Sequence, residues 1–130
     1  MKSVFSGFLI ANPGTGVKGN MLTLEIRLPW YRALPLSVAR IGEILVDGKA
    51  IPLDGAEVEA NGMRFPLPEL ADKTTSFWFV LDSILLHVPV TGLDPAQPHE
   101  ADLQLNIYPP YIPMLTWVTR GSAPLAVHSN

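Results

Sequence analysis

Short runs of alternating apolar and polar residues recur along this chain, with turn residues between them. In the clearest run, Met21–Leu28, every second residue is leucine or isoleucine, and residues 101–108 repeat the alternation. A period of two places apolar side chains on one face of a β-strand. No segment of a dozen residues has the 3,4 spacing of a helix. The pattern predicts an all-β chain folded as an antiparallel β-sandwich, or alternatively as a barrel-like sandwich.

Two dipeptides predict β-hairpins. Asp47-Gly48 and Asn61-Gly62 each stand between two apolar runs. Each dipeptide supplies the two residues with positive φ that a type I′ turn requires. We therefore expect an antiparallel strand on either side of each.

Three further segments complete the predicted order. Val4–Ile10 is predicted to be a strand that ends in a loop at Asn12–Gly16, because NPGTG is rich in turn residues. Phe77–Val90 is predicted to form two strands with a break near Asp82, because one continuous strand would place this acid on an apolar face. Residues 121–130 are expected to form a flexible end.

Composition limits the possible functions. Residues 1–130 are the size of one domain and are predicted to form one. Charged residues make up only 16% of the chain, against about 25% in ordinary soluble domains, so either the core is large or another chain covers part of the surface. The net charge of −3 and the scattered basic residues argue against nucleic-acid binding. Without a long uninterrupted apolar stretch, we expect a cytoplasmic protein with no membrane partner.

The segment LPWYRALPLS, residues 28–37, is the first candidate binding surface. Its two prolines stiffen the backbone, and Trp, Tyr and Arg are enriched at interface hot spots. The alternative is that Trp30 and Tyr31 close the end of the protein's own core while Arg32 pairs with a local carboxylate. The residues assigned to a partner interface here are Pro29, Trp30, Tyr31, Arg32, Leu34 and Pro35.

A second candidate surface is the proline-rich segment 108–117, YPPYIPMLTW. It is predicted to be stiff and extended, and its aromatic residues could contact a partner. Packing across the chain's own sheet is the alternative. The residues assigned to the interface here are Tyr108, Pro110, Tyr111 and Trp117.

No catalytic or metal-binding residue is predicted in this chain. The three histidines lack the spacing of metal ligands, and there is no cysteine. His87 lies within LLHVPV and is expected to be a hydrogen-bonded sheet residue. An independent enzyme that uses Asp82 and His87 ranks last among the hypotheses.

The run LEIRLPWYRALPLS, followed by VDGKAIP and later by GLDPAQPHEADLQL, resembles the small (beta) subunit of bacterial C-glycoside deglycosidases. The resemblance implies a β-sandwich that works with a larger alpha subunit, a TIM barrel of the sugar-phosphate isomerase/epimerase type. That partner would hold a divalent metal, typically manganese, and supply the acid–base residues. The complex would cleave the carbon–carbon bond between a 3-oxo sugar and an aromatic, flavonoid-type aglycone.

The main alternative is a stand-alone carbohydrate-binding β-sandwich. In that case Trp30 and Tyr31 would stack on a sugar ring.

Overall fold

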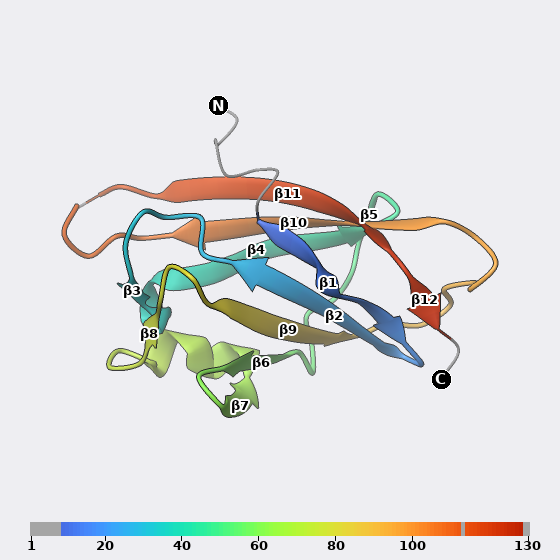
Figure 1. Cartoon of the computed structure of the whole chain (residues 1–130), viewed down its shortest axis with the longest axis horizontal. Helices are drawn as coiled ribbons and strands as arrows, with labels where there is room; N and C mark the ends of the chain where they lie inside the picture. Colours follow the sequence, from blue (N-terminus) through green and yellow to red (C-terminus); the bar gives the residue numbers. More distant parts are fainter. Residues whose placement is uncertain (1–8, 113, 129–130) are drawn as a thin grey trace.

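The computed structural model describes residues 9–112 and 114–128, and Figure 1 shows their strands crossing the molecule in layers. A six-stranded and a four-stranded β-sheet enclose one cluster of buried side chains. A further two-stranded pair lies at one end of the molecule (Figure 1). Both larger sheets have open strand orders and most neighbours are antiparallel, which confirms the predicted all-β sandwich.

The six-stranded sheet is antiparallel except for the pairing of β12 with β1, which is parallel. In order across the sheet, its strands are β12 (Val127–His128), β1 (Ile10–Lys18), β2 (Met21–Arg27), β9 (Ser83–Pro89), β6 (Glu57–Ala60) and β7 (Met63–Pro66).

The other two sheets are antiparallel throughout. The four-stranded sheet has the order β11 (Trp117–Leu125), β10 (His99–Ile107), β4 (Ala39–Val46) and β5 (Lys49–Ala50), and the short pair consists of β3 (Leu34–Pro35) and β8 (Phe77–Trp78). Two 3-10 helices, η1 (Leu36–Val38) and η2 (Leu67–Asp72), follow β3 and β7. No helix within the described residues is long and apolar enough to cross a membrane.

The predicted alternation builds the core. In β2 the side chains of Leu22, Leu24 and Ile26 are fully buried, and in β10 so are those of Leu103 and Leu105. These residues belong to one cluster that spans both sheets. Burying each such side chain contributes roughly 1.5–3 kcal/mol, so this inner layer holds the sandwich together.

Both predicted hairpin turns are confirmed. Asp47 and Gly48 have φ of 53° and 82° between β4 and β5. Asn61 and Gly62 have φ of 53° and 75° between β6 and β7. The predicted break near Asp82 is also present, because β8 and β9 are separate strands.

The predicted loop at Asn12–Gly16 is wrong, because β1 continues through it. The pairing of β1 with β2 shifts register between Ala11 and Gly16. At this bulge the Thr15 hydroxyl donates to the Ala11 carbonyl at 2.7 Å and accepts the Glu25 amide at 3.0 Å. A side chain thus replaces ladder bonds that the bulge interrupts. Most of the predicted strand at Val4–Ile10 lies outside the described residues.

The predicted flexible end at 121–130 is wrong for the described residues up to 128. β11 pairs with β10 along all nine of its residues to Leu125, and β12 pairs with β1. The Ala123 and Leu125 side chains are buried in the core. Because β11 lies at the edge of its sheet, Pro124 is tolerated without a backbone N–H.

Candidate functional site

The two candidate surfaces meet at one end of the sandwich. Residues 28–33 follow β2 and residues 108–116 connect β10 to β11, and Figure 1 shows both loops at the end where β3 and β8 lie. The Tyr108 amide donates to the Val38 carbonyl at 2.9 Å, which ties the second loop to η1. The predictions treated these loops separately, whereas the fold brings them together.

A chain of hydrogen bonds connects the two loops. The Trp30 indole Nε1 donates to the Tyr111 hydroxyl at 2.5 Å, and the Tyr111 hydroxyl donates to the Tyr31 hydroxyl at 3.0 Å. The hydrogen bond with Tyr111 is the main cause that raises the pKa of Tyr31 above its usual value.

Ring contacts complete the cluster. The Trp30 and Trp117 rings pack edge to face with centroids 5.4 Å apart, and the Trp30 and Tyr31 centroids are 5.1 Å apart. The Arg32 guanidinium carbon lies 4.9 Å from the centre of the Tyr111 ring, within cation–π range. We call Trp30, Tyr31, Arg32, Tyr111 and Trp117 the aromatic cluster.

Burial divides the predicted interface residues into three groups. The buried ones are Pro29, Trp30 and Leu34, and the half-buried ones are Pro35 and Trp117. The exposed ones are Tyr31, Arg32, Tyr108, Pro110 and Tyr111. The buried group supports the loops from inside, and the exposed group presents aromatic and cationic side chains to solvent.

The alternative for residues 28–37, in which Trp30 and Tyr31 close the core and Arg32 pairs with a carboxylate, is therefore correct for Trp30 only. Trp30 is 6% exposed and closes the core, whereas Tyr31 is 65% exposed. Arg32, for which a carboxylate was the expected partner, lies over the Tyr111 ring. Because Trp30 is buried, it cannot stack on a sugar as the carbohydrate-binding alternative required.

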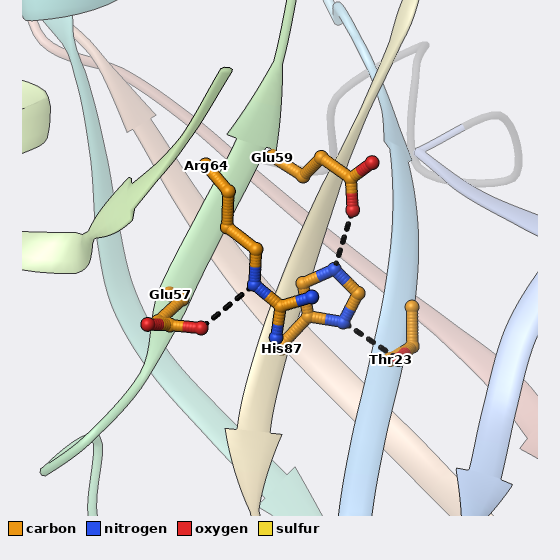
Figure 2. Close-up of polar contacts among 5 residues, drawn as sticks. All are labelled: Thr23, Glu57, Glu59, Arg64 and His87. Atoms are coloured by element: carbon orange, nitrogen blue, oxygen red, sulfur yellow. Dashed lines mark hydrogen bonds and ion pairs between the residues drawn. The ribbon is translucent and has the colours of Figure 1, made fainter. Parts of the chain in front are cut away.

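The expectation for His87 is confirmed. Figure 2 shows its imidazole between Thr23 of β2 and Glu59 of β6, on the outer face of the six-stranded sheet. Its Nδ1 lies 2.9 Å from the Thr23 hydroxyl, and its Nε2 lies 3.0 Å from Glu59 Oε1. Beside it, Arg64 Nε donates to Glu57 Oε1 at 2.7 Å (Figure 2). Both ring nitrogens have partners, as a buried sheet histidine requires.

The structure keeps apart Asp82 and His87, the two residues of the enzyme hypothesis that ranks last. Asp82 lies just before β9 (Ser83–Pro89) and His87 lies within it, five residues and so about 16 Å apart at the rise of an extended strand. A hollow of about 320 Å³ is lined by Thr23 and by residues of β1, but by neither His87 nor Glu59. Among the described residues, no group of three or more His, Cys, Asp or Glu side chains could hold a metal.

His99 forms a polar anchor at the far end of β10. Its Nδ1 lies 2.5 Å from Asp47 Oδ2, and its Nε2 lies 2.8 Å from the Asp94 carbonyl oxygen. Asp47 raises the pKa of His99, and the hydrogen bond to His99 lowers the pKa of Asp47. The sequence did not reveal this pairing between residues 52 positions apart.

Sequence reasoning missed one exposed apolar feature. Phe79, Val80 and Leu81 form a turn between β8 and β9, and all three side chains are exposed. The prediction placed these residues in the first of the two strands within Phe77–Val90, whereas β8 ends at Trp78.

Comparison with known proteins gives a consistent result. A family model described as C-glycoside deglycosidase beta subunit matches residues 12–111. A C-glycoside deglycosidase beta subunit of Microbacterium trichothecenolyticum is 37% identical over 94 residues, which cover 72% of this chain and 71% of the relative. One of the same name from Arthrobacter globiformis is 39% identical over 89 residues, 68% of each chain. A 3'-dehydrocarminate deglycosidase beta subunit of Microbacterium sp. is 39% identical over 90 residues, 69% of this chain and 67% of the relative.

Proposed function

Because the chain belongs to the C-glycoside deglycosidase beta subunit family, we propose that it is the beta subunit of a heteromeric C-glycoside deglycosidase. The family match over residues 12–111 carries this proposal. The enzyme would cleave the carbon–carbon bond between a 3-oxo sugar and an aromatic aglycone, in the cytoplasm. One relative with 39% identity is named a 3'-dehydrocarminate deglycosidase beta subunit, and the 3'-dehydro group in that name supports a 3-oxo sugar as the reacting unit.

The proposal assigns the chemistry to the alpha subunit, a barrel of the sugar-phosphate isomerase/epimerase type. A bound divalent metal, expected to be Mn²⁺, would polarise the 3-oxo group there. Acid–base residues of the alpha subunit would move the protons that the elimination requires. One finding supports this division: the family and the relatives are named as beta subunits, which implies a partner subunit.

The beta chain would contribute a docking surface, formed by the aromatic cluster. Its exposed members are Tyr31, Arg32 and Tyr111, residue types enriched at the centres of interfaces. Trp30 and Trp117 hold them from behind. Because these side chains are already fixed by contacts with one another, docking costs less side-chain entropy than flexible loops would.

Reconstitution tests the proposal. The chain, the alpha subunit and their mixture are assayed separately for cleavage of a 3-oxo C-glucoside, and the mixture is run on size exclusion. We expect one co-eluting complex, full activity in the mixture and no activity in the beta chain alone. Cleavage by the purified beta chain would overturn the non-catalytic assignment, and a mixture that neither co-elutes nor gains activity would overturn the subunit assignment.

A further inference from the structure

We propose that the turn Phe79–Val80–Leu81, here called the apolar turn, is a second docking element, and that Leu81 inserts into an apolar pocket of the alpha subunit. This inference rests on the proposed function, because it takes the alpha subunit as the occupant. It adds an element that neither the sequence prediction nor the family comparison identifies.

The composition of this turn is unusual. Turns are normally built from Gly, Pro, Asn, Asp and Ser. The Asp47-Gly48 and Asn61-Gly62 turns follow that rule. The apolar turn instead exposes three successive apolar side chains, and Leu81 at its tip is 96% exposed. Contiguous exposed apolar residues on a soluble protein mark a contact surface.

The backbone of the turn is held firmly. The preceding Trp78 is fully buried, and its indole Nε1 donates to the Asp82 carbonyl at 2.9 Å, across the turn. The Asp82 amide donates to the Phe79 carbonyl at 3.0 Å. On the entering side, the Phe77 carbonyl accepts the Asn61 amide side chain at 2.8 Å. A fixed apolar tip loses little backbone freedom on binding, which is the property of a preorganised anchor.

The apolar turn lies at the same end of the sandwich as the aromatic cluster. β8 leads into it and pairs with β3, with Trp78 opposite Leu34, and Leu34 directly follows the loop that carries Tyr31 and Arg32. Figure 1 shows β8, β3 and the loops 28–33 and 108–116 at one end of the molecule. A single partner surface that covers this end would meet both features.

The side chains indicate the chemistry of the occupant. Val80 and Leu81 offer neither a flat ring for a sugar to stack on nor a cation for a phosphate. An aliphatic tip that directly follows the exposed Phe79 fits a concave apolar pocket on a protein. Since a beta subunit implies a partner subunit, the alpha subunit is the occupant that the observations favour over a membrane or a second copy of this chain.

The test compares Leu81→Asp with the control Ala96→Asp, which adds the same charge to another exposed residue. Ala96 lies in the loop before β10, whereas the loop of the aromatic cluster follows the opposite end of β10. Affinity for the alpha subunit is measured by calorimetric titration, and folding by thermal unfolding. We expect Leu81→Asp to weaken binding by about tenfold or more, with an unchanged melting temperature because the side chain is exposed. Ala96→Asp should bind like the wild type.

Each other result is decisive. If Leu81→Asp binds the alpha subunit as tightly as the wild type, the docking role is wrong while the proposed function stands. If the wild type itself does not bind, the proposed function fails first and the docking role fails with it. If Leu81→Asp instead abolishes self-association in ultracentrifugation, or binding to anionic lipid vesicles, the occupant is a second copy or a membrane and this assignment is overturned.

Discussion

Tyr111 is the central residue of the aromatic cluster. Within the described residues, the buried Trp30 indole N–H donates its hydrogen bond to the Tyr111 hydroxyl. Tyr111→Phe removes that acceptor and leaves a buried N–H unpaired. We expect the free energy of unfolding to fall by about 1–3 kcal/mol. The matched control, Tyr31→Phe, removes an exposed hydroxyl at the end of the same chain and should cost at most about 0.5 kcal/mol. Urea unfolding of both variants checks this, and equal effects would contradict the arrangement.

A second prediction concerns pH and the His99–Asp47 pair. Asp47 raises the pKa of His99 above 6.5, so the contribution of His99 to stability is complete below pH 6.5 and is lost as the pH rises through its folded-state pKa. The pKa of Asp47 is lowered from 3.8, so its contribution is lost as the pH falls through that lower value. We expect the pair to stabilise the fold most between the ordinary pKa values of the two groups, 3.8 for Asp47 and 6.5 for His99.

Thermal unfolding of wild type and His99→Asn from pH 5 to pH 9 measures this effect. The melting-temperature difference between the two proteins should shrink as the pH rises above 6.5. A constant difference across this range would show that His99 is not held as a cation.

His87 carries a third prediction. His87→Ala should lower the stability of the chain, because Thr23 and Glu59 lose their shared partner. The activity of the complex with the alpha subunit should stay within about twofold of the wild type, since the proposed chemistry lies in the partner. A large loss of kcat in a complex that still assembles would mean that His87 acts on the substrate.

At this scale the sequence identified residue types but not their partners. Trp30 and Tyr111 were both predicted as interface residues, yet they are 81 positions apart and no local pattern specifies that their loops share one end. Trp30 was predicted to contact a partner, whereas its side chain is buried in the core of this chain. Whether a tryptophan faces inwards depends on the packing of distant strands, which alternation alone does not determine.

Strands in which apolar and polar residues alternate regularly were predictable, whereas strands with an irregular sequence were not. β2 and the two hairpin turns follow from local rules, namely the period of two and the positive φ of Asp-Gly and Asn-Gly. β1 contains a bulge within NPGTG, and β11 contains Gly121 and Pro124. These residues usually mark loops, but long-range pairing with β2 and β10 keeps both segments extended.

The bulge in β1 gives a prediction for this element. Thr15→Val keeps the side-chain shape but removes the hydroxyl that accepts the Glu25 amide. We expect a loss of about 1–3 kcal/mol from the unpaired amide, and faster hydrogen exchange at Glu25. Thr15→Ser keeps the hydroxyl and should cost under about 1 kcal/mol. If Thr15→Val is no less stable than Thr15→Ser, the hydroxyl does not support the bulge.

The whole molecule has two ends of different character. One end carries the exposed members of the aromatic cluster and the apolar turn, and the other carries polar turns such as Asp47-Gly48 with its His99 anchor. The low charge content of 16% predicted either a large core or a surface covered by another chain, and composition could not say which part of the surface that would be. Only the fold, by bringing two distant loops and β8 together, indicates one end.

Hydrogen exchange followed by mass spectrometry, on the chain alone and in complex with the alpha subunit, tests this most directly. Amides that a partner covers exchange more slowly, so the method locates the contact surface. The account predicts slower exchange in the complex at residues 28–37 and 108–117, with the outer face of the six-stranded sheet unchanged. Protection of the sheet face around Thr23, Glu59 and His87, with both loops unchanged, would contradict it.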